Sequence, residues 1–162
     1  MTNLRLMGVT KDAKTAGPGK RFELFTKGCI RGVINPCEGC FNESTWTFEG
    51  PYRHMPVEEL VGIIDRDAWN RQVTMCGGEP ILQARPLMEV AKRLKELDSS
   101  FHIILYTAYK LDALMKHGLK FTWVPQYGEA MREQLIEHSY AHTRSMHKTE
   151  FIILRPEDVR EL

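Results

Sequence analysis

Short apolar runs alternate with amphipathic stretches along this chain of 162 residues. The apolar runs have the length of β-strands, whereas the amphipathic stretches repeat their apolar positions every three or four residues, as helices with one buried face do. This pattern predicts helices at 56–66, from Pro86 onward, at 111–117 and at 129–137, and strands at 22–26, 73–76, 103–107, 121–124 and 151–154.

The alternation of strands and helices predicts an α/β fold, in which a parallel sheet is covered by helices on its outside. A complete eight-stranded barrel usually needs about 250 residues, so we expect a partial, open (βα) barrel instead. No internal repeat or linker divides the sequence, and we therefore expect a single domain over residues 1–162.

The composition restricts the classes of partner. Hydrophobic residues make up 43% of the chain, which is enough for a core, and 22 basic residues nearly balance 21 acidic ones. This balance gives no electrostatic reason to expect nucleic acid or an anionic membrane surface as a partner. No apolar run approaches the roughly 20 residues of a membrane-spanning helix, and the first residues lack the apolar segment of a secretory signal. We expect a soluble, cytoplasmic protein.

Three of the four cysteines, Cys29, Cys37 and Cys40, lie within twelve residues on the longest stretch without periodicity. In a reducing compartment, clustered cysteines indicate ligands rather than disulfides, and thiolates suit a soft metal or an iron–sulfur cluster. Three thiolates leave one iron of a [4Fe–4S] cluster open to another ligand. A structural zinc site would need a fourth protein ligand, such as Cys76 or a histidine. The spacing alone leaves both interpretations open.

A glycine turn, Gly77-Gly78-Glu79-Pro80, follows the predicted strand at 73–76. Taken alone, this sequence is typical of a turn. Paired glycines also allow backbone groups to approach a ligand, and ligands of α/β sheets bind at the carboxyl ends of strands. Cys76, just before the turn, is most simply a small buried residue. Trp46 is most simply a packing residue, with shielding of a metal site as the alternative.

Five segments, taken together and in order, resemble the anaerobic ribonucleotide reductase activating enzymes. The resemblance extends over roughly residues 15–115, and the residues after about 120 match poorly. The segments that carry it are Gly17-Pro18-Gly19-x-Arg21, Phe25-x-x-Gly28-Cys29, Cys37-x-Gly39-Cys40-Phe41-Asn42-x-Ser44-Thr45-Trp46, Gly77-Gly78-Glu79-Pro80 and Tyr106-Thr107-Ala108-Tyr109-Lys110-Leu111-Asp112.

The resemblance implies a partial barrel of the radical S-adenosylmethionine (SAM) type, with a [4Fe–4S] cluster on Cys29, Cys37 and Cys40. It implies that SAM binds the open iron through its amino and carboxylate groups. It implies no catalytic residue beyond the cluster ligands. The residues that would line the SAM pocket are Gly39, Cys40, Phe41, Gly77, Gly78 and Glu79.

The implied activity is reductive cleavage of SAM to a 5′-deoxyadenosyl radical, which removes a hydrogen from a glycine of an anaerobic ribonucleoside-triphosphate reductase. The implied partners are that large glycyl-radical subunit and an electron donor such as flavodoxin or ferredoxin. We expect residues 42–53 and 138–148 at the contact with the large subunit. The alternatives are a radical SAM enzyme acting on a small molecule, similar to 7-carboxy-7-deazaguanine synthase, and a non-enzymatic zinc or cluster-binding module.

One departure from the family concerns the cysteine spacing. Seven residues separate Cys29 from Cys37, where the family has three. Lengthening a loop by four residues raises the entropic cost of closing it by only about a few tenths of a kcal/mol. We therefore expect the cluster to survive the insertion, with Gly32 and Pro36 folding the extra segment back on itself.

Overall fold

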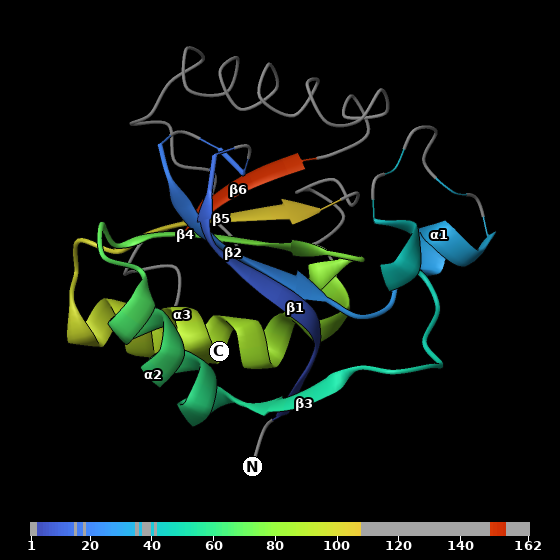
Figure 1. Ribbon diagram of the computed structural model, residues 1–162, viewed down its shortest axis with the longest axis horizontal. Helices are drawn as coiled ribbons and strands as arrows, with labels where there is room; N and C mark the ends of the chain where they lie inside the picture. Colours follow the sequence, from blue (N-terminus) through green and yellow to red (C-terminus); the bar gives the residue numbers. More distant parts are fainter. Residues whose placement is uncertain are drawn as a thin grey trace.

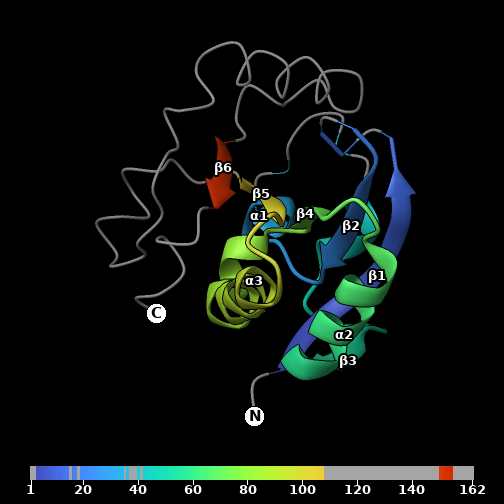
Figure 2. The same cartoon turned by 90° about the vertical axis from the view of Figure 1, so that its left-hand side faces the viewer.

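The computed structural model describes residues 3–14, 16–17, 19–34, 36, 40, 42–107 and 150–154. Two longer helices, α2 (Val57–Asp67) and α3 (Ala84–Leu97), lie on the same side of one sheet (Figures 1 and 2). The shorter helical segments are α1 (Ile30–Ile34), η1 (Glu43–Thr45) and η2 (Pro80–Gln83). The strands are β1 (Asn3–Ala13), β2 (Arg21–Thr26), β3 (Arg53–Pro56), β4 (Gln72–Gly77), β5 (His102–Thr107) and β6 (Glu150–Leu154).

The sheet is mixed, with the strand order β3-β1-β2-β4-β5-β6. Its central strands β2, β4 and β5 are parallel, whereas β1, β3 and β6 pair antiparallel with their neighbours. The prediction of an α/β fold is therefore confirmed, but the prediction of a parallel sheet is wrong for the outer strands. Sequence reasoning missed β1, because the second half of this strand is polar and exposed and shows no apolar run.

The core lies between the sheet and the two longer helices. The apolar stripes predicted on α2 and α3 are buried there, with Leu60, Ile64, Leu87 and Leu94 fully covered. Alternate strand residues face them, since side chains of a strand point to opposite faces in turn. Phe22, Leu24, Val73, Met75, Ile103 and Leu105 supply this layer of the core. Glu23 and Cys76 belong to the other face of the sheet.

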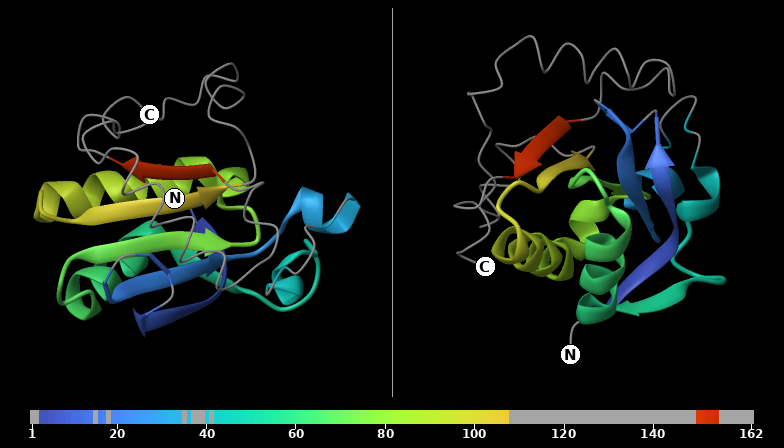
Figure 3. Two further views of the ribbon diagram at one scale, coloured as in Figure 1. Left: turned by 90° about the horizontal axis from the view of Figure 1, so that it is seen from above. Right: turned by 60° about the vertical axis from the view of Figure 1, so that its left-hand side comes forward.

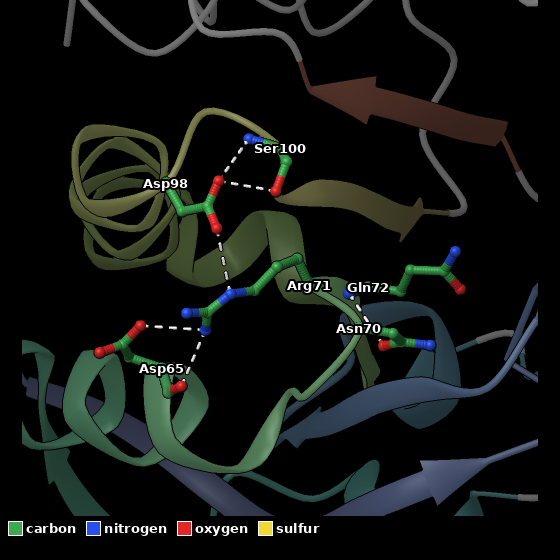
Figure 4. Close-up of polar contacts among 6 residues, drawn as sticks. All are labelled: Asp65, Asn70, Arg71, Gln72, Asp98 and Ser100. Carbon is green, nitrogen blue, oxygen red and sulfur yellow. Dashed lines mark hydrogen bonds and ion pairs between the residues drawn. The ribbon is translucent and has the colours of Figure 1, made fainter.

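Arg71 fastens the loops at the amino edge of the sheet (Figure 4). Its Nη1 donates to the backbone oxygen of Asp65 at 2.8 Å, and its Nε donates to Oδ2 of Asp98 at 3.2 Å. The guanidinium also lies 4.8 Å from the ring centroid of Phe101. These contacts hold the ends of α2 and α3 together where β4 and β5 begin, at the edge opposite to the carboxyl ends of the strands.

Arg21 explains part of the Gly-Pro-Gly-x-Arg segment. This buried guanidinium donates to Oγ1 of Thr74 at 2.7 Å, and to the backbone oxygens of Val73 and His102 at 2.9 Å each. Arg21 therefore joins all three parallel strands at their amino ends. The segment lies at the opposite edge of the sheet from the cysteine loop, so its described residues stabilise the fold rather than form the site.

The burial of His102 predicts that the stability of the protein depends on pH. Burial, followed by the positive charges of Arg21 and Lys95, lowers the pKa of His102 to about 4. An unfolded histidine has a pKa of about 6.5. The unfolded chain therefore takes up the proton first as the pH falls. The free energy of unfolding should therefore decline between about pH 6.5 and about pH 4.

The variant His102→Asn tests this expectation, because its amide oxygen can still accept from Nη2 of Arg21, which lies 3.0 Å from Nδ1 in the wild type. Urea unfolding of the two proteins at several pH values should show a flatter profile for the variant. Parallel profiles would mean that His102 does not carry the pH dependence.

The predicted elements at 111–117, 121–124 and 129–137 lie outside the described residues, as does the segment 138–148, whereas the predicted strand at 151–154 is confirmed as part of β6. Within the part of the chain that the structure describes, no helix is both long and apolar enough to span a membrane.

Candidate metal centre

The cysteine loop and the glycine turn leave the sheet side by side. Thr26, the last residue of β2, is paired in parallel register with Gly77, the last residue of β4. The loop that follows β2 carries Cys29 into α1, which lies beyond the ends of the strands (Figure 3). The two sequence features that pointed to chemistry therefore meet at one sheet edge, as expected for parallel neighbours.

The glycine turn is hydrogen-bonded to the start of the cysteine loop. The N–H of Gly78 donates to the carbonyl of Thr26 at 3.0 Å, and the N–H of Glu79 donates to the carbonyl of Gly28 at 2.8 Å. A Cβ added at Gly77 would lie 2.6 Å from the carbonyl oxygen of Thr26, and one added at Gly78 would lie 2.9 Å from the carbonyl carbon of Gly28. The two glycines are thus required by the close approach of the protein's own backbone.

The two glycines are therefore needed for a different reason from the one that the sequence suggests. The sequence suggested that they let a ligand approach, whereas the space next to both Cα atoms is filled by β2 and the cysteine loop. Gly77 also has a φ of 133°, which favours glycine over any residue with a side chain. Contacts of these residues with SAM stay a prediction.

Glu79 fastens the turn to the neighbouring strand. Its side chain is 4% exposed, and Oε1 accepts hydrogen bonds from the N–H of Ile81 at 3.0 Å and from Oγ1 of Thr107 at 2.7 Å. The first contact caps η2, and the second reaches the carboxyl end of β5. Glu79 therefore links the turn to a third parallel strand, and its predicted contact with SAM is untested.

Cys29 stands at the start of α1. Its carbonyl accepts the first helical hydrogen bond, from Val33 at 3.2 Å, and its half-buried sulfur lies 3.3 Å from the amide nitrogen of Gly32, which donates to it. The N–H of Cys29 donates to the carbonyl of Trp46 at 2.9 Å. The backbone on both sides of this sulfur is consequently fixed.

Cys40 is held by the residues that follow it. Its half-buried sulfur accepts the backbone N–H of Asn42 at 3.4 Å and Nε1–H of Trp46 at 3.4 Å. The side-chain amide of Asn42 also donates to the carbonyl of Gly77 at 3.2 Å. Asn42 thereby connects Cys40 to the glycine turn, a role that the sequence did not reveal because the two segments are far apart along the chain.

The enlarged spacing after Cys29 is taken up by α1 rather than by a folded-back turn at Gly32. This glycine lies within the helix and is seated against Trp46, since an added Cβ would lie 2.5 Å from Cδ1 of the indole. Three apolar residues of α1, Ile30, Val33 and Ile34, are exposed, with Ile34 at 77%. Pro36 is exposed.

Lys27 and Gln83 hold the two ends of the cysteine loop through hydrogen bonds. The sequence analysis did not predict a role for either residue. Lys27 is buried, and its Nζ donates to the carbonyl of Ser44 at 3.2 Å and to Oγ1 of Thr47 at 3.1 Å. The amide nitrogen of Gln83 donates to the carbonyl of Lys27 at 3.2 Å. These contacts form a clamp around the segment that follows Cys40. The burial of Lys27 is set by the fold, so no local sequence pattern indicates the clamp.

The two cysteines of the loop that the structure describes are suitable ligands for an iron–sulfur cluster. Cys29 and Cys40 are thiols rather than disulfides, and each sulfur faces a backbone N–H donor. Hydrogen bonds of this kind stabilise the negative charge of cluster thiolates. Cys37, Gly39 and Phe41 lie outside the described residues. Among the described residues, no three histidine, cysteine, aspartate or glutamate side chains are grouped so that they could hold a metal.

Cys76 differs from the other two described cysteines in its burial and in its hydrogen-bond partner. It is 7% exposed, as expected for a small buried residue, and its sulfur donates to Oε2 of Glu23 at 3.4 Å. Burial, followed by the nearby Glu23 carboxyl, raises the pKa of the Cys76 thiol well above its usual range, and burial also raises the pKa of Glu23. A thiol that resists ionisation is a poor zinc ligand, and Cys76 forms no metal-binding group with Cys29 and Cys40.

Comparison with known proteins decides the family. Residues 15–127 match the model of the 4Fe-4S single cluster domain, which is more than half of the chain. The chain belongs to this family. Three curated relatives are the pyruvate formate-lyase-activating enzymes of Staphylococcus aureus strains USA300, NCTC 8325 and COL. Each is 40% identical over 85 residues, which cover 49% of this chain and 32% of the relative.

The 4Fe-4S cofactor predicted from the sequence is thereby confirmed for the family. The relationship to a glycyl-radical activase is also confirmed, as a distant homology to the pyruvate formate-lyase-activating enzyme. The matched segment spans about a third of the length of these relatives. The comparisons do not single out the ribonucleotide reductase branch that the motifs resemble.

Proposed function

We propose that this chain is a radical SAM activase that generates a glycyl radical on an anaerobic ribonucleoside-triphosphate reductase. Cys29, Cys37 and Cys40 would hold the [4Fe–4S] cluster, with an electron donor such as flavodoxin or ferredoxin. A bound and reduced cluster of this kind supplies the electron that splits SAM into methionine and a 5′-deoxyadenosyl radical. SAM would lie along residues 39–41 and the Gly77–Glu79 turn.

The observation that carries this proposal is the junction between Cys40, Asn42 and Gly77. Asn42 donates its backbone N–H to the sulfur of Cys40 and its side-chain N–H to the carbonyl of Gly77. The predicted cluster ligand Cys40 and the strand-end turn are thus held next to each other. An enzyme that binds SAM at a cluster needs this arrangement, because the open iron and the ligand pocket must coincide.

The chain's own residues would orient the cluster ligands for this reaction. The bonds from Gly28 to Thr45 and from Cys29 to Trp46 pair the cysteine loop with the segment after Cys40. Such rigid support limits the movement of the cluster ligands, and preorganisation of this kind is how a protein fixes a cofactor against its substrate.

Mixing experiments test the activity and the target. The anaerobically reconstituted chain, combined with SAM, a reductant and the large reductase subunit, should produce a glycyl radical detected by electron paramagnetic resonance. Omitting SAM should abolish the signal, and an equal mixture containing Cys40→Ala should give less than about one hundredth of it, because that variant lacks a cluster ligand.

A second target is favoured by the curated relatives, whose name specifies pyruvate formate-lyase. A parallel mixture with pyruvate formate-lyase separates the two: a radical on that protein alone would move the assignment to it. SAM cleavage without a radical on either protein, accompanied by conversion of a small heterocycle, would favour the deazaguanine synthase-like alternative. Zinc in place of iron would leave only the binding module.

A further inference from the structure

Trp46 contacts the cysteine loop at three described positions, Cys29, Gly32 and Cys40. Its carbonyl accepts the N–H of Cys29 at 2.9 Å, and its indole Nε1–H donates to the sulfur of Cys40 at 3.4 Å. Gly32 of α1 packs against the indole ring, so closely that there is no room for a Cβ at this position. One residue therefore touches Cys29, Cys40 and the helix that takes up the enlarged spacing.

The position of Trp46 is itself fixed by the protein. The preceding residue, Thr45, accepts the N–H of Gly28 at 2.7 Å and bonds to the carbonyl of Asn42 through both its N–H and its hydroxyl. Lys27 holds Ser44 and Thr47 on either side through Nζ. The indole is thus presented to Cys40 by a backbone that is restrained at several points.

We propose that Trp46 is a positioning residue that sets the reduction potential of the cluster through its hydrogen bond to Cys40. This inference rests on the proposed function, because it takes Cys40 as a cluster ligand. Reduction adds an electron whose charge spreads over the sulfur atoms. An N–H that points at one of these sulfurs stabilises the reduced state more than the oxidised state and raises the potential.

The indole hydrogen bond differs from the backbone hydrogen bond of Asn42 to the same sulfur in one practical respect, since it can be removed by substitution. Trp46→Phe keeps an aromatic ring against Gly32 and removes only the donor and the second ring. Trp69→Phe is the matched control: Trp69 is exposed, and its Nε1 donates to Oδ1 of Asp12 at 3.1 Å, far along the chain from the cysteine loop.

The test is a redox titration of the full chain with its cluster and without SAM, followed by the paramagnetic signal of the reduced cluster. Trp46→Phe should retain about four irons per chain. At a fixed applied potential, its ratio of reduced to oxidised cluster should fall about tenfold, which is about 59 mV toward negative values for a one-electron couple. Trp69→Phe should titrate as the wild type.

An unchanged potential in Trp46→Phe would overturn the inference, as would a folded variant that assembles no cluster, since the indole would then serve assembly instead. If Trp46→Phe fails to fold, Gly32→Ala replaces it, because its methyl group displaces the indole and should shift the potential in the same direction. An unchanged potential there also overturns the inference. A wild type without a [4Fe–4S] cluster would instead contradict the proposed function.

Discussion

Alanine in place of Cys29, Cys37 or Cys40 should abolish the cluster, whereas Cys76→Ala should retain about four irons and four sulfides per chain. The reason is that three thiolates are the minimum that holds a [4Fe–4S] cluster open at one iron. Cys76 is buried against Glu23 with a thiol pKa well above its usual range, so it is unsuited to bind metal as a thiolate. Anaerobic iron, sulfide and zinc analysis of the five proteins measures the outcome.

The pattern among the variants separates three kinds of site. A zinc site with four protein ligands predicts a colourless wild type and damage from Cys76→Ala. A rearranged cluster that uses Cys76 predicts a harmless Cys29→Ala, which would contradict the assignment of Cys29. The environment of Cys29, with its sulfur beside the N–H of Gly32 at the start of α1, supports the first pattern.

Gly78→Ala should lower the free energy of unfolding by about 2–3 kcal/mol, because overpacking against rigid groups has costs of that order. Its Cβ would overlap the carbonyl group of Gly28, which is backbone and cannot rotate away. The hydrogen bonds from Gly78 to Thr26 and from Glu79 to Gly28 should be lost with it. Chemical denaturation of the apoprotein measures the change without involving the cluster.

Gly62→Ala is the matched control for this prediction. Gly62 lies in the exposed part of α2, and nothing lies within 4 Å of the added Cβ. Alanine in a helix interior should therefore stabilise the protein by about 0.5–1 kcal/mol. Equal stabilities of Gly78→Ala and the wild type would show that the turn can move away from the cysteine loop.

The same steric argument applies to Gly77→Val, a substitution that would otherwise test SAM binding at the turn. Valine there would overlap the backbone of Thr26 and adopt an unfavourable φ. A loss of SAM affinity in that variant would report a displaced turn. Trp46 and Asn42 offer sharper tests of the site, because their side chains contact the sulfur or the turn through single hydrogen bonds.

The sequence by itself determined the elements that carry a strong periodic pattern. The stripes of α2 and α3 and the apolar runs of β2, β4 and β5 were predictable, because burial of one face imposes the spacing of apolar residues. The five segments that resemble the activating enzymes, taken together and in order, likewise indicated the cluster family, which the match over residues 15–127 confirms. Short-range chemistry and local pattern were sufficient for these conclusions.

Only the tertiary structure decided how these parts are joined. The polar half of β1 has no pattern that marks it as a strand, and its pairing with β2 makes the sheet mixed. The clamp of Lys27, the bridge of Asn42 and the indole bond of Trp46 all connect segments through contacts that no local pattern encodes. The glycines at 77 and 78 show the physical reason: a missing Cβ is visible in the sequence, but the group that occupies its space is brought there by the fold.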